Sequence, residues 1–131
     1  MTLQIPYDTS VLPVGVRSRF IDNTNGLLMH VLEAGYEGSN KPVILLLHGF
    51  PELAYSWRKI IPTLATAGFH VIAPDLRGYG RTLGWGPVGY DSDLTSFNLL
   101  NTVRDAIGLI NALGYEKITG VVGHDYGASV A

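Results

Sequence analysis

The sequence contains no cysteine among its 131 residues. Disulfide bonds, thiolate nucleophiles and cysteine-based zinc sites are therefore excluded. A chain without disulfides suits a reducing compartment, and we expect a cytoplasmic protein. The first eight residues have neither a basic start nor an apolar core, so no secretory signal is expected. The longest apolar run, residues 43–47, is far too short to cross a bilayer, and we expect no membrane span.

The sequence also lacks any block of like charges. Nine Lys and Arg residues stand against eleven Asp and Glu residues, which gives a net charge of -2. Without a basic patch, neither nucleic acid nor an anionic membrane surface is an expected partner. The composition, 47% hydrophobic and 15% charged, is typical of one globular domain, and no cofactor is indicated.

The first third of the chain predicts an antiparallel hairpin after an irregular lead-in over residues 1–15. Apolar and polar residues alternate over residues 16–21, as in a half-exposed strand. Asn25-Gly26 is a strong hairpin-turn signal, and residues 27–34 are the expected return strand.

The rest of the chain alternates between expected strands and helices. Residues 42–47 are apolar throughout, as in a parallel strand that is buried on both faces. A helical pattern around Trp57 to Leu64 contains Pro62, which must kink or restart the helix. Two further strands, at residues 70–74 and 117–122, flank a helix predicted over residues 94–113. This order predicts an α/β fold with a mostly parallel sheet and helices on both faces.

Three polar clusters follow the expected parallel strands, at residues 48–52, 75–80 and 123–127. Ligands bind at the carboxyl ends of such strands, so these clusters mark a candidate site. The last has the pattern G-x-D-x-G, which is the nucleophile-elbow pattern with aspartate, Asp125, in the serine position. The alternative for this cluster is a helix-capping turn without chemistry. For residues 75–80 we expect a structural turn held by the Asp75 carboxylate.

Four stretches in this order and spacing resemble the epoxide hydrolases of the α/β-hydrolase superfamily, over a region from about Ile21 to the last residue. They are His48-Gly49-Phe50-Pro51-Glu52, Trp57-Arg58, Asp75-Leu76-Arg77-Gly78-Tyr79-Gly80 and Gly123-His124-Asp125-Tyr126-Gly127. The resemblance implies that Asp125 is the nucleophile, and that the backbone N–H groups of Phe50 and Tyr126 form the oxyanion hole. The remaining site residues that it implies are loop and pocket positions: His48, Gly49, Pro51 and Trp57, the last near the pocket floor.

A carboxylate suits this chemistry because it is already ionised at neutral pH and needs no base to attack. The expected reaction forms a covalent ester with a small apolar epoxide, which water then hydrolyses to a diol. Haloalkane or haloacid dehalogenase activity is the alternative within the superfamily. Against it, Phe50 replaces the halide-binding Asn of haloalkane dehalogenases, and Tyr126 replaces the Arg of fluoroacetate dehalogenases. Tyr126 also differs from the Trp that is frequent in epoxide hydrolases.

The four histidines all precede Asp125, whereas the family's base follows its nucleophile. We read His30 and His70 as ordinary strand residues and His124 as structural.

We therefore expect residues 1–131 to be one partial α/β-hydrolase domain, the N-terminal half, truncated after the elbow and without a second domain. Base, acid and lid would come from a segment outside this chain, which alone would be inactive. Uncovered edges and faces are expected at residues 43–47 and 117–122, to be covered by a second chain or segment or by self-association. The non-enzymatic alternative is an inactive fragment or interaction module.

Overall fold

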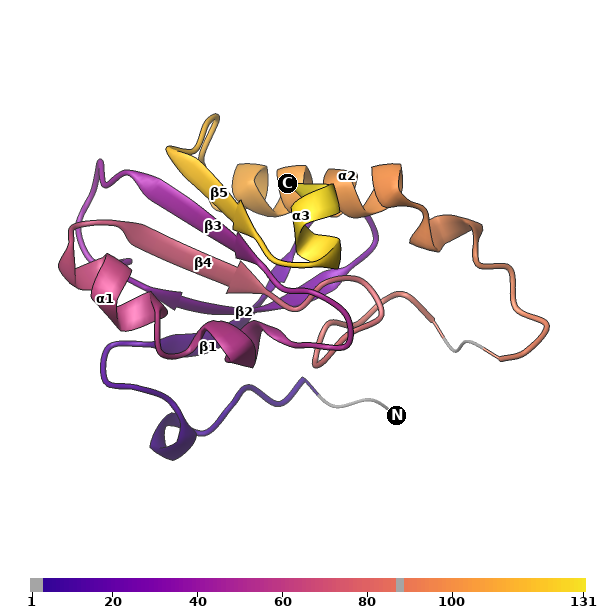
Figure 1. The fold of residues 1–131 in the computed structure, drawn as a ribbon, viewed down its shortest axis with the longest axis horizontal. Helices are drawn as coiled ribbons and strands as arrows, with labels where there is room; N and C mark the ends of the chain where they lie inside the picture. Colours follow the sequence, from indigo (N-terminus) through magenta and orange to yellow (C-terminus); the bar gives the residue numbers. More distant parts are fainter. Residues whose placement is uncertain (1–3, 87–88) are drawn as a thin grey trace.

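The computed structural model describes residues 4–86 and 89–131. Its centre is a five-stranded mixed sheet with the strand order β1-β2-β4-β3-β5 (Figure 1). The strands are β1 (Arg17–Asp22), β2 (Leu28–Ala34), β3 (Val43–Leu47), β4 (His70–Pro74) and β5 (Gly120–Gly123). Strands β3, β4 and β5 are parallel to one another, so their carboxyl ends meet at one edge of the sheet. The predicted α/β class with a mostly parallel sheet is confirmed.

The predicted N-terminal hairpin is present. Strands β1 and β2 pair antiparallel, from Arg17 opposite Glu33 to Asp22 opposite Leu28. The backbone N–H of Asn23 donates to Leu27 O at 3.0 Å and closes the connecting loop. Strand β2 also pairs antiparallel with β4, which joins the hairpin to the parallel part of the sheet.

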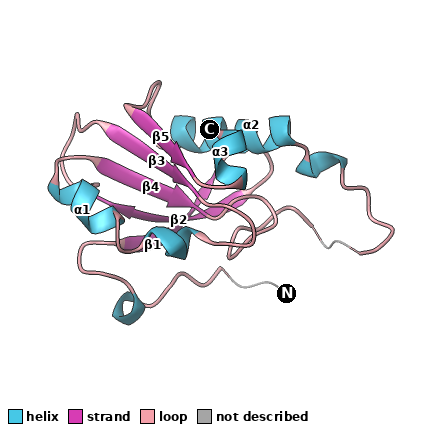
Figure 2. Ribbon diagram, viewed as in Figure 1, coloured by secondary structure: helices cyan, strands magenta, loops and turns pink. Residues whose placement is uncertain are grey.

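Helices cover both faces of the sheet, as the sequence predicts (Figures 1 and 2). Helix α1 (Ile61–Thr66) lies on one face, and α2 (Leu99–Ala112) and α3 (Tyr126–Val130) lie on the other. Strand β3 contributes side chains to the hydrophobic core on both faces of the sheet, because successive side chains of a strand point in opposite directions. Leu46 belongs to the core cluster under α1, whereas Leu45 and Leu47 belong to the cluster under α2. Short 3-10 turns complete the helical elements: η1 (Thr9–Val11), η2 (Ala54–Trp57) and η3 (Thr95–Phe97).

Three predicted elements differ from the structure by more than one residue. The helical pattern from Trp57 to Leu64 is not one helix, because η2 ends at Trp57 and α1 begins at Ile61 with Pro62 in its first turn. Proline has no N–H to lose in a first turn, so it restarts the helix here and does not kink it. Helix α2 begins at Leu99 and not at residue 94, since the side chain of Asn98 caps it by accepting the Asn101 N–H. Strand β5 begins at Gly120 and not at residue 117.

The expectation of an uncovered edge is wrong for β3 and holds for β5. Strand β3 pairs with β4 on one side and β5 on the other, and Leu45, Leu46 and Leu47 are buried. In the part of the chain that the structure describes, β5 pairs only with β3. Val121 and Val122 of β5 are 39% and 45% exposed, so the sheet has an open edge here.

Candidate active site

Asp125 lies at the sharp turn between β5 and α3, with φ 54° and ψ −121°. This combination lies outside the regions that non-glycine residues commonly adopt, so the backbone is strained at Asp125. The Asp125 side chain is exposed. Close packing explains the glycine two positions later. A Cβ on Gly127 would lie 2.1 Å from the carbonyl oxygen of Leu47, so only glycine lets α3 approach β3. The turn is held by His124 N–H donating to Leu47 O at 3.1 Å.

The loop after β3 meets this turn. The backbone N–H of Phe50 donates to Asp125 Oδ2 at 3.0 Å. Gly49 makes the approach possible, because a Cβ there would lie 2.5 Å from the Asp125 Cβ. The Glu52 N–H donates to Gly49 O at 2.9 Å and closes the loop, in which the Phe50–Pro51 peptide bond is cis. Gly49, Phe50 and Pro51 therefore form one tight turn directed at Asp125.

The charge of the Asp125 carboxylate is stabilised by backbone donors. The hydrogen bond from the Phe50 N–H, followed by the adjacent N–H of Tyr126, holds the pKa of Asp125 below its usual range, against the opposing effect of burial. The neighbouring His124 lowers this pKa further. The carboxylate is thus ionised at neutral pH, and the two N–H groups that the sequence singled out both act on it.

His48 lies behind this loop and is fully buried. Its Nδ1 is 2.9 Å from Gly49 O, and its Nε2 is 3.0 Å from the backbone nitrogen of Leu76. A carbonyl only accepts and an N–H only donates, so the ring carries its hydrogen on Nδ1 and accepts at Nε2. Burial lowers the pKa of His48, which favours this neutral form.

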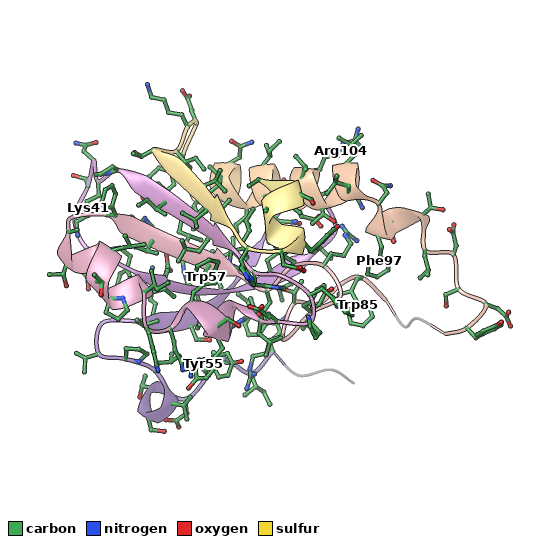
Figure 3. The ribbon with its side chains drawn as sticks, in the orientation of Figure 1. Lys41, Tyr55, Trp57, Trp85, Phe97 and Arg104 are labelled. Carbon is green, nitrogen blue, oxygen red and sulfur yellow. The ribbon has the colours of Figure 1, made fainter. Side chains whose placement is uncertain are left out.

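A shallow pocket of about 310 Å³ opens beside the two turns. It is lined by Phe50, Arg77, Tyr79, Phe97, Thr102 and Tyr126. The Tyr126 hydroxyl lies 3.2 Å from Thr102 Oγ1, so α2 helps to position the residue after Asp125. Figure 3 shows Phe97 next to Trp85, with ring centroids 6.2 Å apart. Sequence reasoning did not single out Phe97 or Thr102, because they belong to a helical region that carries no recognisable motif.

Trp57 does not line this pocket. Trp57, which is labelled in Figure 3, packs against the core cluster on the α1 face of the sheet, which includes Leu46 and Ile61. Its indole nitrogen is buried and has no hydrogen-bond partner among the described residues. The predicted place of Trp57 near a pocket floor stays a prediction.

Asp75 has the structural role that the sequence predicts. Its buried carboxylate accepts hydrogen bonds from the N–H groups of Ala54 (2.9 Å) and Arg81 (3.0 Å) and from His30 Nδ1 (2.7 Å). Burial would raise the pKa of Asp75, but these donors outweigh it and the pKa is lowered. Because Ala54 begins η2, the carboxylate fixes the chain just after the Phe50 loop.

His30 is not the ordinary strand residue that we expected. Its Nε2 lies 2.6 Å from Ser18 Oγ, so Ser18, His30 and Asp75 form a hydrogen-bonded series with the composition of a hydrolytic triad. The series is closed to substrates, since His30 and Asp75 are fully buried and Ser18 Oγ also accepts the Tyr7 N–H at 2.9 Å. It therefore braces the lead-in segment against the sheet.

His70 is not an ordinary strand residue either, and His124 pairs with Glu52 and not with the Asp125 carboxylate. The Nε2 of His70 lies 2.7 Å from Glu33 Oε2, in a buried cluster that sequence reasoning did not find. His124 is exposed, and its Nδ1 lies 3.3 Å from Glu52 Oε1. All four histidines are among the described residues, and no imidazole nitrogen hydrogen-bonds to the Asp125 carboxylate.

Within residues 4–86 and 89–131, no three His, Cys, Asp or Glu side chains lie close enough to hold a metal ion together. None of the helices in these ranges is both long and apolar enough to cross a membrane.

Comparison with known proteins gives a consistent set of relatives. Epoxide hydrolase 3 of Siraitia grosvenorii is 47% identical over 109 residues, which cover 83% of this chain and 31% of the relative. Epoxide hydrolase A of Mycobacterium tuberculosis is 43% identical over 117 residues, which cover 89% and 34%. The crystal structure of epoxide hydrolase A from Mycobacterium thermoresistibile superposes with a TM-score of 0.76 at 41% identity, over 88% of this chain and 33% of that one.

The chain spans about a third of the length of the curated relatives it matches. A family model described as the alpha/beta hydrolase fold matches residues 42–131, which contain β3, the Phe50 loop, β4, α2, β5 and the Asp125 turn. The matched part is the larger share of the chain and holds every element that positions Asp125. This chain belongs to the α/β-hydrolase fold family.

Proposed function

We propose that this chain carries the nucleophile and oxyanion hole of an epoxide hydrolase. The observation that carries the proposal is the 3.0 Å hydrogen bond from the Phe50 N–H to Asp125 Oδ2, at an elbow with positive φ. It places an ionised carboxylate at the carboxyl ends of the parallel strands, where ligands bind in sheets of this kind. Relatives named epoxide hydrolases at 43–47% identity support the substrate class.

The first step is attack by a carboxylate oxygen of Asp125 on an epoxide carbon. A C–O bond of the three-membered ring breaks, and an ester forms between that carbon and Asp125. The ring oxygen leaves with the electron pair of the broken bond and takes a proton from an acid. Because Asp125 is held ionised by two N–H donors, it attacks without prior deprotonation.

The second step is hydrolysis of that ester. Water, deprotonated by a base, adds to the carboxyl carbon of Asp125 and places negative charge on its oxygen. The N–H groups of Phe50 and Tyr126 stabilise that oxygen, and one such donor is typically worth about 3–4 kcal/mol. Collapse of the intermediate breaks the bond between the carboxyl carbon and the Asp125 oxygen that had attacked the substrate. That oxygen leaves as a hydroxyl of the diol and takes the proton of the added water oxygen, which stays behind in the restored carboxylate.

Base, acid and lid are proposed to come from a segment outside residues 1–131. The rings of His30, His48 and His70 are occupied by other partners in the core, and His124 pairs with Glu52. The relatives are about three times as long as this chain, which leaves room for such a segment. The open edge at β5 and the apolar groove beside it, lined by Leu47, Ile110 and Val121, are where it would pack.

The test is a single turnover with the intact protein in excess over an epoxide, in water labelled with ¹⁸O. Because water attacks the carboxyl carbon, we expect the label in Asp125 and an unlabelled diol. Label in the diol after one turnover would exclude the covalent route. A haloalkane in place of the epoxide tests the dehalogenase alternative, and no turnover of either substrate by the intact protein would favour an inactive module.

A further inference from the structure

One peptide group connects His48 to the proposed oxyanion hole. The carbonyl of Gly49 and the N–H of Phe50 belong to the same planar unit, so rotating one rotates the other. The N–H end donates to Asp125 Oδ2 at 3.0 Å. The carbonyl end accepts from His48 Nδ1 at 2.9 Å and from the Glu52 N–H at 2.9 Å. The orientation of the Phe50 N–H is therefore set by what holds the Gly49 carbonyl.

The two donors to this carbonyl differ in what they are attached to. Glu52 belongs to the same loop and moves with it. His48 is fully buried, and its Nε2 accepts the N–H of Leu76, which follows β4 and is also fully buried. Leu76 adjoins Asp75, whose carboxylate is fixed by three donors. Of these two donors, His48 is the one that ties the peptide to the end of β4.

We propose that His48 is a positioning residue that aligns the Phe50 N–H with the oxygen of Asp125 by donating from Nδ1 to the Gly49 carbonyl. This role rests on the proposed function of Asp125 and Phe50. A hydrogen bond accepted by the carbonyl also polarises the peptide group and makes its N–H a better donor. His48 itself stays neutral and exchanges no proton with substrate.

Two substitutions separate the two hydrogen bonds of the ring. His48→Asn keeps a donor near the position of Nδ1 and loses the acceptor for Leu76. His48→Gln places an acceptor near the position of Nε2 and loses the donor to Gly49. Both remove one buried hydrogen bond, so comparable losses in melting temperature are expected, and each variant serves as the stability control for the other.

The kinetic measurement resolves ester formation from ester hydrolysis in the intact protein. In His48→Gln, hydrolysis slows about tenfold or more, because a misplaced donor loses much of its stabilisation of the oxyanion. The Asp125 ester then accumulates, and KM falls along with kcat. In His48→Asn, hydrolysis stays close to the wild-type rate. Equal slowing in both variants would overturn the proposal.

A second measurement does not depend on catalysis. Carbon-13 NMR of the Asp125 carboxyl group should show a higher pKa in His48→Gln than in the wild type, and an unchanged pKa in His48→Asn. An unchanged pKa in both variants overturns the role of His48, whatever the kinetics. In the wild type, nitrogen-15 NMR of the ring must show a neutral imidazole protonated at Nδ1. A ring protonated at Nε2 would exclude the donation to Gly49 even if neither variant folds.

These readouts distinguish the two proposals. If the wild type forms no ester at Asp125, the proposed function fails, while the NMR comparison still decides whether His48 sets the Phe50 hydrogen bond. If the wild type forms the ester but the two variants behave alike, the proposed function stands and the positioning role of His48 fails.

Discussion

The guanidinium of Arg77 and the carboxylate of Asp105 form a buried bidentate ion pair. Nε of Arg77 lies 2.9 Å from Oδ2 of Asp105, and Nη2 lies 2.8 Å from Oδ1. Arg77 follows β4 and lines the pocket beside Asp125, whereas Asp105 is in α2. The pair therefore joins the pocket wall to the helix behind it, and it neutralises an arginine that would otherwise present a free charge to the pocket.

Asp105→Ala should destabilise the protein by about 3–5 kcal/mol, because it leaves the buried Arg77 charge without a partner. Chemical denaturation of the wild type and the variant measures the difference. Asp22→Ala is the control, since Asp22 is exposed and, within residues 4–86 and 89–131, its carboxylate accepts only the N–H of Thr24, at 2.8 Å. A loss for Asp105→Ala no larger than that of the control would show that the ion pair contributes little.

Asp125→Asn should abolish turnover while preserving the fold. Asparagine has the same shape and tolerates positive φ, but its amide does not attack a saturated carbon. Loss of the nucleophile should reduce the epoxide turnover of the intact protein at least about 10³-fold. Asp93→Asn, in an exposed loop, is the matched control and should retain activity. Substantial turnover by Asp125→Asn would contradict the assignment of the nucleophile.

Gly127→Ala should destabilise the elbow by about 1–3 kcal/mol or more, because the added Cβ would lie 2.1 Å from Leu47 O. Gly120→Ala, at the start of β5, is the control. A Cβ there meets no atom within 4 Å, and Gly120 does not have positive φ, so this change should be close to neutral. Thermal unfolding of the two variants compares them, and equal melting temperatures would exclude the close packing of α3 on β3.

The free energy of unfolding should fall in acid because of Glu33. Burial alone would raise the pKa of this carboxyl group, but hydrogen bonds from His70, Arg19 and Arg17 lower it from 4.5 to about 2. A lowered folded-state pKa gives stability that is complete above pH 4.5 and is lost as the pH falls through about 2. The shift corresponds to about 3 kcal/mol.

Denaturation of the wild type and of Glu33→Gln between pH 2 and pH 6 measures this effect. The neutral amide does not titrate, so the variant should lack the part of the acid slope that Glu33 contributes. Parallel pH profiles for the two proteins would mean that Glu33 is not held ionised in the folded state.

Local patterns predicted the parts of this molecule whose causes are local. Alternation and apolar runs indicated the hairpin and β3, and the spacing of Gly123, Asp125 and Gly127 indicated the elbow. The sequence did not indicate the partners of His30 and His70, because these depend on which side chains the sheet places opposite one another. Trp57 shows the same limit: a motif places it in order along the chain, but packing decides which face of the sheet it joins.

The place of β5 beside β3 has a consequence for the order of folding. Phe50 and Asp125 are separated by 75 residues, and β4 and α2 form in between. Contacts of such long sequence separation form slowly, because the intervening chain must first be ordered. During synthesis the side of β3 that receives β5 stays vacant after β4 has docked on the other side. The Asp125 carboxylate therefore meets the Phe50 N–H only after β5 has paired with β3, so a nascent chain that has not yet reached β5 has no assembled nucleophile.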